Sequence, residues 1–299
     1  MRLPVVVALL VSGACARGSA IRESDLEPDA ATAPADAAPG TVDAPGATGT
    51  PDAPSGPALT GTQLLLTEVV LAPTTQELIE IANPTSQTVD LSTYYLSDNG
   101  NYFRLPAGAP ALDTGDFIVK FPAGATIAPG AVITVALDTA ASYTTAYGSA
   151  PTYSVASATL AVVASNGIST LTNGGELVAL FTWNGTADLV KDVDLVLAGA
   201  PTIANGLVDK SAVAQDGPDA GTTTTAYAAD AKTMVVMGST PASGKSTKRL
   251  VREAGHETQA GGGNGISGDD ETSEDTAATW DSSGFTNPTP GAVPPAVLQ

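Results

Sequence analysis

The chain has 299 residues, enough for one large domain or two small ones, and a hydrophobic content of 43% permits a real core. The formal net charge is -19, from 12 basic and 31 acidic residues. A surface this acidic repels phosphate backbones, so we expect no direct nucleic-acid binding. It fits solubility, cation binding or a basic partner. The single cysteine excludes an internal disulfide.

The N-terminus has the order of a secretory signal, predicted over residues 1–14. A short positive start is followed by the apolar run 3–11 and by small residues directly before Cys15. Residues 11–15 resemble the lipobox of bacterial lipoproteins, although Ser12 stands where an aliphatic residue is usual. That resemblance implies a lipidated Cys15; the alternative is an ordinary signal with a chance cysteine. The apolar run is too short to span a bilayer, and no later segment is long enough. The lipid would then be the only membrane attachment.

Residues 15–60 are predicted to form a disordered tether. From residue 28 to 58 the chain is almost entirely Ala, Pro, Asp, Gly and Thr. Such a segment buries too little apolar surface to offset its ordering entropy, and proline keeps it extended. In polyproline geometry it reaches roughly 100 Å. We therefore expect a domain that is held away from a membrane.

Short strands separated by turn signals are predicted from residue 61 onward. In residues 77–81, Ile79 and Ile81 point to one face, while Leu78 and Glu80 point to the other. Residues 98–101 are typical of a hairpin turn, which predicts that the next strand returns at once. This spacing favours an all-β sandwich or barrel. The predicted strands are 64–71, 77–81, 89–91, 94–96, 102–105, 117–121, 131–137, 176–183 and 189–197, with further candidates at 234–237, 248–252 and 280–285.

Three stretches have weaker patterns. Residues 138–170 are predicted to be irregular with one or two edge strands, residues 205–242 a long loop, and residues 255–276 an exposed loop. In the strand 189–197, strict alternation puts Asp192 and Asp194 on one face, which we interpret as polar surface.

Several segments resemble the lamin tail domain family. The resemblance implies an immunoglobulin-like β-sandwich over residues 61–292, with long insertions after Leu137 and Leu197 and a tail at 293–299. Bacterial members of that family are typically exported and often accompany extracellular enzyme domains, but no enzyme domain is recognised here. The similar segments are 66–70, 77–84, 89–98, 126–130, 173–181, Lys248-Arg249, Trp280 and 288–291.

An acidic run near the C-terminus is the best candidate for a metal site. Calcium takes six to eight oxygen ligands, which a carboxylate-rich loop can supply. The spacing is not that of an EF-hand, so a solvated acidic loop remains the alternative, as it does for the acidic turn at 216–219. The candidate ligands are Asp269, Asp270, Glu271, Glu274 and Asp275.

Other chemistries find little support. Residues 244–247 read Gly-Lys-Ser-Thr, but Ser239 stands where a phosphate-binding loop needs its first glycine. His256 is the only histidine, which excludes a two-histidine metal site within one chain, and its glycine-rich surroundings indicate solvent exposure. Scattered carboxylates and few aromatic residues do not single out a glycosidase pair. Trp183 and Trp280 are interpreted as residues of the sandwich core or its edge.

The sequence thus predicts a non-catalytic binding or structural module, without a cofactor, on a lipid-anchored tether at the cell envelope. The expected partner is an envelope protein or a glycan. The alternative is a divalent-metal-dependent extracellular hydrolase of unfamiliar type.

Overall fold

The structure is a computed structural model that describes residues 58–108, 110–200, 208–231, 238–259 and 261–299. The predicted signal, Cys15 and almost all of the predicted tether lie outside the described residues. The candidate strand at 234–237 lies outside them as well. No helix in the described part of the chain is both long enough and apolar enough to cross a bilayer.

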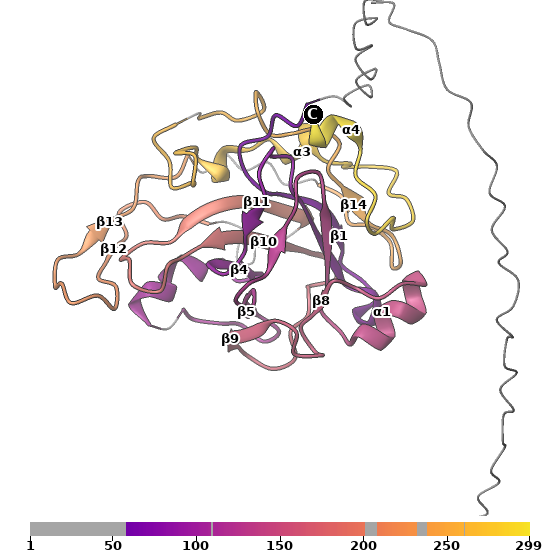
Figure 1. The fold of residues 1–299 in the computed structure, drawn as a ribbon, viewed down its shortest axis with the longest axis horizontal. Coiled ribbons are helices and arrows are strands. Elements are labelled where there is room, and N and C mark those ends of the chain that lie inside the picture. Colours follow the sequence, from indigo (N-terminus) through magenta and orange to yellow (C-terminus); the bar gives the residue numbers. More distant parts are fainter. Residues whose placement is uncertain (1–57, 109, 201–207, 232–237, 260) are drawn as a thin grey trace, which may run out of the picture. The chain divides into compact units, whose positions relative to one another are not determined.

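Two five-stranded sheets form a β-sandwich, as predicted (Figure 1). The first sheet has the order β14-β1-β2-β7-β8, and the second has the order β11-β10-β4-β5-β9. All neighbours pair antiparallel except β7 and β8. The strands of the first sheet are β1 (Leu65–Val70), β2 (Leu78–Ala82), β7 (Val132–Ala136), β8 (Tyr153–Ser154) and β14 (Thr247–Lys248). Those of the second are β4 (Tyr94–Ser97), β5 (Phe117–Lys120), β9 (Ala161–Ser165), β10 (Gly175–Thr182) and β11 (Lys191–Gly199).

The alternation predicted for β2 is confirmed. Ile79 and Ile81 lie in the main core between the sheets, whereas Leu78 packs on the opposite face with Tyr143. Short strand pairs complete the β structure: β3 (Val89–Asp90) pairs with β6 (Thr126–Ile127), and β12 (Ala214–Gln215) pairs with β13 (Thr225–Ala226).

The alternation predicted for residues 189–197 is wrong, because β11 carries a bulge. The register of β10 against β11 shifts between Leu180, which pairs with Asp194, and Phe181, which pairs with Asp192. Val193 therefore joins the main core, while Leu195 lies in a second cluster. A bulge adds one residue to one strand and so reverses the faces beyond it. Asp192 and Asp194 are also not surface residues: they are 1% and 0% exposed.

Two predicted strands are not formed. Residues 102–105 belong to the 3₁₀ helix η2 (Tyr102–Ala107), which contains Pro106 and ends at Gly108 with a φ of 102°. The N–H groups of Tyr102 and Arg104 bond instead to the carbonyls of Asn99 and Asn101, and Pro106 could not have donated to a strand ladder beyond residue 105. Residues 280–285 follow the short helix α3 (Thr276–Thr279), and Trp280 makes only an isolated bridge with Arg249. The predicted strand at 248–252 is reduced to β14.

Residues 138–170 contain the edge strands β8 and β9, as predicted, and also a helix that was not predicted. This helix, α1 (Ala140–Tyr147), begins where the Thr139 hydroxyl accepts a hydrogen bond from the Ser142 N–H, and it ends at Gly148 with a φ of 79°. A threonine N-cap and a left-handed glycine after the last turn are typical helix boundaries.

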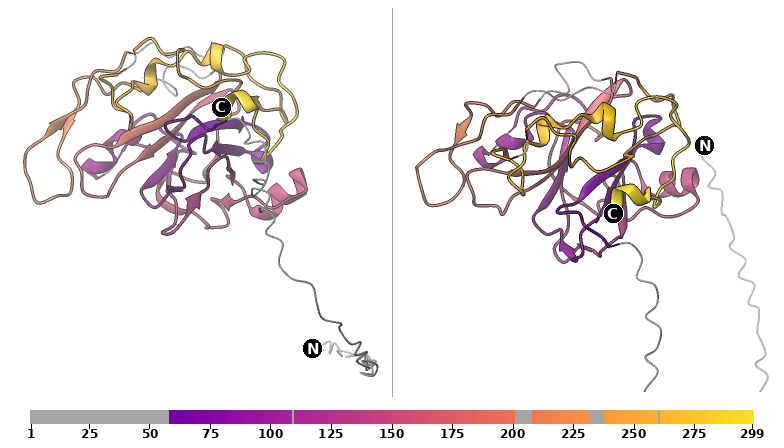
Figure 2. Two further views of the ribbon diagram at one scale, coloured as in Figure 1. Left: turned by 45° about the horizontal axis from the view of Figure 1, so that its top comes forward. Right: turned by 90° about the horizontal axis from the view of Figure 1, so that it is seen from above.

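The C-terminal segments cover one side of the sandwich, and the loop predicted to be exposed at 255–276 is only partly so: His256 is exposed, whereas residues 270–274 are buried. Figures 1 and 2 show residues 238–299 running over the sheets, with β12 and β13 at one end of the domain and α1 at the other. The remaining elements of this part are η3 (Glu271–Ser273) and α4 (Pro295–Leu298), and the predicted tail packs through the buried Val297. Trp280 is buried in the main core, which confirms its predicted role.

Candidate functional site: a cavity beside buried carboxylates

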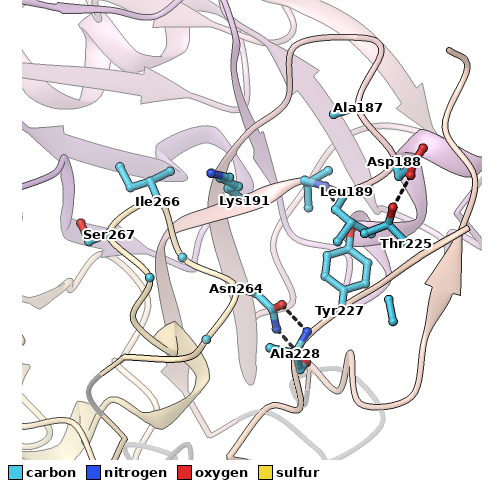
Figure 3. Close-up of a pocket in the computed structure, with 15 residues that line it drawn as sticks. Ala187, Asp188, Leu189, Lys191, Thr225, Tyr227, Ala228, Asn264, Ile266 and Ser267 are labelled. Carbon is cyan, nitrogen blue, oxygen red and sulfur yellow. Dashed lines mark hydrogen bonds between the residues drawn. The ribbon is translucent and has the colours of Figure 1, made fainter.

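A cavity of about 640 Å³ opens on the surface where three segments meet (Figure 3). Its walls are residues 187–191 at the start of β11, residues 225–228 around β13, and the glycine-rich residues 263–268. Ligand sites commonly measure roughly 300–1,000 Å³, so this cavity has the size of a binding site.

Hydrogen bonds from two side chains fix the walls of the cavity. The Asn264 amide accepts from the Ala228 N–H at 2.9 Å and donates to the Ala228 carbonyl at 3.1 Å, as Figure 3 shows. The Tyr227 hydroxyl donates to the Phe103 carbonyl at 2.8 Å and accepts from the Val190 N–H at 3.1 Å. These bonds join segments that are far apart in the sequence, so side chains of the protein itself hold the cavity walls together.

Two opposite charges lie in the cavity wall. Asp188 accepts hydrogen bonds from the Thr225 hydroxyl and from the Gly217 N–H, and these bonds lower the pKa of Asp188 below its ordinary value. Lys191 is exposed on the other side of the cavity (Figure 3). The wall therefore offers an acceptor, a cation and backbone groups to a polar ligand.

The C-terminal segments that cover the sandwich, residues 238–259 and 261–299, are called the C-terminal cover below. Arg249 belongs to this cover, is fully buried and binds two carboxylates. Its Nη2 lies 2.8 Å from both oxygens of Asp194, and its Nη1 lies 2.6 Å from Glu274 Oε1. Its Nε donates to the Leu66 carbonyl at 2.8 Å, and its guanidinium stacks over Trp280. A guanidinium suits this role because its planar fork matches a carboxylate.

A second buried cation, Lys210, binds the other aspartate of β11, Asp192. Lys210 Nζ lies 2.8 Å from Asp192 Oδ2 and 3.4 Å from Asp230 Oδ1. Burial opposes the charge on Lys210, but the two carboxylates raise the pKa of Lys210 above its ordinary value. The Tyr102 hydroxyl donates to the other oxygen of Asp192. Because of the bulge in β11, Asp192 binds Lys210 while Asp194 binds Arg249.

Three carboxylates converge next to Arg249. One oxygen each from Asp194, Glu253 and Glu271 lies within 4.8 Å of the other two, and these side chains are 0%, 8% and 2% exposed. The Gln63 Nε2 points at this carboxylate trio, with distances of 2.9 Å to Glu253 Oε1 and 3.0 Å to Glu271 Oε1. Glu271 also borders the cavity wall, since a Cβ on Gly265 would lie 2.9 Å from its Oε1.

Burial raises the pKa of both glutamates of the trio. The pKa of Glu271 stands well above its ordinary value because of burial first and the charges of Glu253 and Asp194 second. The pKa of Glu253 is raised by burial and by Asp194, and Arg249 only partly offsets this. Binding a proton or a cation would therefore stabilise each of these buried carboxyl groups.

The acidic run predicted as a calcium site does not converge on one point. Asp270 and Asp275 cap η3 and α3 by accepting hydrogen bonds from the N–H groups of Thr272 and Ala277. Glu274 binds Arg249 and Glu271 belongs to the carboxylate trio, while Asp269 is half-buried. A fully solvated acidic loop, the alternative, is not formed either, because three of the five side chains are buried: Asp270, Glu271 and Glu274.

The sequence prediction missed Gln63, Glu253 and Lys210. Each lies beside other polar residues in a segment without alternation, so its burial had no local signal. Arg249 carried one signal, since it matches the closing arginine of the lamin tail resemblance. Asp194 carried another, because a carboxylate inside a strand of large aliphatic residues needs a buried partner.

His256 and Lys245 lie in loops near the surface. His256 is exposed, as predicted. Lys245 donates to Asn287 Oδ1 at 2.6 Å in a surface turn before β14, in place of the strand and helix that a phosphate-binding loop requires.

Taken with the fold, these features define an immunoglobulin-like β-sandwich module with an added C-terminal cover. Residues 57–194, just under half of the chain, match the sequence model of the Lamin Tail Domain family, which confirms the predicted resemblance for this part of the chain. No curated protein and no solved structure matches the chain significantly. The lamin tail domain is an immunoglobulin-like structural domain that is not known for enzymatic activity. The matched residues end at Asp194, so Arg249, Glu253, Glu271 and most of the cavity lie beyond them.

Proposed function

We propose that this protein is a non-catalytic binding module, displayed at a bacterial cell envelope on a lipid-anchored tether. The observation that supports binding is the cavity at β11 and β13, which segments beyond the family match build against the sandwich. The ligand is an envelope protein segment or a glycan that bears polar groups, because Asp188, Lys191 and backbone groups face the cavity.

The hydrolase alternative gains no support from the carboxylate trio. A catalytic metal needs a coordination position that is open to substrate and water. Asp194, Glu253 and Glu271 are at most 8% exposed, and the C-terminal segments cover them. A cation held there would be structural.

Binding is tested by filling the cavity. Ala226 is exposed and lines the cavity, so Ala226→Trp places an indole in the ligand's position. We expect the full chain, when immobilised, to retain purified envelope glycans or envelope proteins, and we expect the variant to lose at least tenfold in affinity. Ala141→Trp is the matched control, since Ala141 is an exposed alanine on α1. Equal binding by both variants would rule out the cavity as the binding site.

Anchoring is tested separately at Cys15. The residues before Cys15 have the order of a lipoprotein signal, and a thioether-linked lipid would supply the membrane attachment. In cell fractionation we expect the wild-type protein in the membrane pellet and Cys15→Ala in the soluble fraction. Ser12→Leu restores the aliphatic residue usual in lipoprotein signals and should leave the protein in membranes. A Cys15→Ala protein that stays in the pellet would contradict lipidation.

A further inference from the structure

We propose that Asp194, Glu253 and Glu271 bind one divalent cation, calcium by preference, which fastens the C-terminal cover to the sandwich. The three side chains come from three separate places: Asp194 from β11, Glu253 from the turn after β14, and Glu271 from η3. The cation would join these segments at one point. This inference is independent of what the cavity binds.

Two of the three buried carboxylates lack a counter-charge among the described residues. Arg249 is committed to Asp194 and Glu274 at 2.6–2.8 Å. Neither Glu253 nor Glu271 forms an ion pair with a lysine or arginine of the described residues. Removing a carboxylate from water without a counter-charge is costly. A single divalent cation offsets the two glutamates that Arg249 does not neutralise.

One buried oxygen of the trio has no hydrogen-bond partner among the described residues. Glu253 is 8% exposed, and its Oε2 has no hydrogen-bond partner among the described residues. Buried polar atoms almost always have a partner, and an exception needs an explanation. Glu253 belongs to the carboxylate trio, and a buried carboxylate oxygen that lacks a donor is available to a metal ion.

The hydrogen-bond donor beside the trio is shared among too many acceptors. The Gln63 amide nitrogen lies 2.6 Å from the Val193 carbonyl, 2.9 Å from Glu253 Oε1 and 3.0 Å from Glu271 Oε1. An amide nitrogen carries two hydrogens, so it cannot fully satisfy three acceptors. One glutamate oxygen therefore needs a different partner, and a cation between the carboxylates provides it.

The oxygen ligands select the kind of cation. Carboxylates suit calcium and magnesium, whereas zinc and copper sites favour histidine or cysteine, and neither residue is in the trio. Three carboxylates from separate segments can each bind through one oxygen or two, which suits the variable geometry of calcium better than the strict octahedron of magnesium.

The test begins with the full chain stripped by a chelator. A ligand that binds only the folded state raises its stability. At free calcium about 100 times Kd, we expect the melting midpoint to rise by roughly 5–10 °C. Terbium, which takes the place of calcium, should show emission sensitised by Trp280, because that indole packs on Arg249 next to the trio.

Variants locate the ion. Glu253→Gln and Glu271→Gln should each fold, because each removes a charge from an excess of buried carboxylates, and each should lose the calcium shift and the terbium emission. Asp269→Asn changes a carboxylate of the same loop outside the trio and should keep both signals. Asp188→Asn controls for a second group of carboxylates, formed by Asp188, Asp216 and Asp219, and should keep both as well.

The calcium shift and the terbium emission, measured on these variants, decide whether the trio binds the ion. A shift and an emission that either glutamine variant abolishes support the site, and the two variants serve as replicates if one fails to fold. A wild-type midpoint that does not respond to calcium, together with no terbium emission, overturns the proposal. So does a response that survives both glutamine variants or disappears in Asp188→Asn.

Discussion

At the scale of single residues, Arg249 connects the C-terminal cover to the sandwich. It is fully buried, and it contacts β1 through the Leu66 carbonyl, β11 through Asp194, and the segment between η3 and α3 through Glu274. A buried ion pair often contributes little net stability over an apolar substitute of the same shape, but breaking one by removing a single partner leaves an uncompensated charge.

Arg249→Met is therefore expected to be strongly destabilising. Methionine keeps much of the volume but leaves Asp194 and Glu274 buried without a cation. We expect the free energy of unfolding to fall by roughly 3–5 kcal/mol. Urea unfolding followed by tryptophan fluorescence measures this, since Trp280 stacks on the guanidinium.

The control for this prediction is Arg252→Met. Arg252 lies three residues further along the same segment and is only half-buried. Its loss should change the free energy of unfolding by less than about 0.5 kcal/mol, as is usual for surface positions. Equal effects of the two substitutions would show that Arg249 does not organise the buried carboxylates.

At the scale of elements, the hairpin of β12 and β13 is fastened to the sandwich by polar side chains. Gln215 on β12 donates through Nε2 to the carbonyls of Phe103 and Asp188 at 2.9 and 2.8 Å. The Tyr227 hydroxyl, directly after β13, reaches the same Phe103 carbonyl. The hairpin forms one wall of the cavity, so these bonds set the cavity's shape.

Tyr227→Phe should loosen this hairpin while leaving the sandwich folded. The substitution keeps the ring but removes a donor to Phe103 and an acceptor for the Val190 N–H. We expect a loss of roughly 1–3 kcal/mol and faster hydrogen exchange at the amides of residues 213–227. Tyr147→Phe is the control: it removes a hydroxyl that donates to the Gln76 carbonyl beside α1, and exchange should rise there instead. Unchanged exchange in the hairpin of Tyr227→Phe would contradict this assignment.

The sandwich strands could be predicted from the sequence because their signal is local. Ile79 and Ile81 alternate with their neighbours, and that alternation alone identifies β2. The prediction failed where the determining contact is distant. The bulge at Val193 depends on the register against β10, and η2 forms where Pro106 prevents a ladder.

The buried carboxylates show the same limit more strongly. Asp194 and Arg249 are separated by 55 positions, and Gln63 and Glu271 by 208. No periodicity over a short window relates such residues. Composition indicated only that carboxylates outnumber cations, and the fold decides which of them are removed from water.

At the scale of the whole molecule, some acidic side chains are exposed to solvent and others are buried inside the domain. Three glutamates in the sandwich show that burying a carboxylate disfavours its charged form. Burial raises the pKa of Glu77 to about 8, and it raises the pKa values of Glu80 and Glu176 to about 7. Backbone and side-chain donors lower these values in part: Leu171 N–H binds Glu77, and Thr67 Oγ1 binds Glu80. The folded state therefore holds protons that the unfolded chain releases near pH 4.5.

These groups predict that the folded domain loses stability as the pH rises from about 5 to 8. Between the unfolded pKa of 4.5 and the folded values of about 7–8, the native state binds more protons than the unfolded state, so the free energy of unfolding falls with pH. Urea unfolding at pH 5 and pH 8, with chelator to remove cations, measures the slope. Glu77→Gln should flatten it, because the amide has no proton to release. A free energy of unfolding that increases over this range would show that the buried glutamates are ionised in the native state, with counter-charges that lower their pKa values.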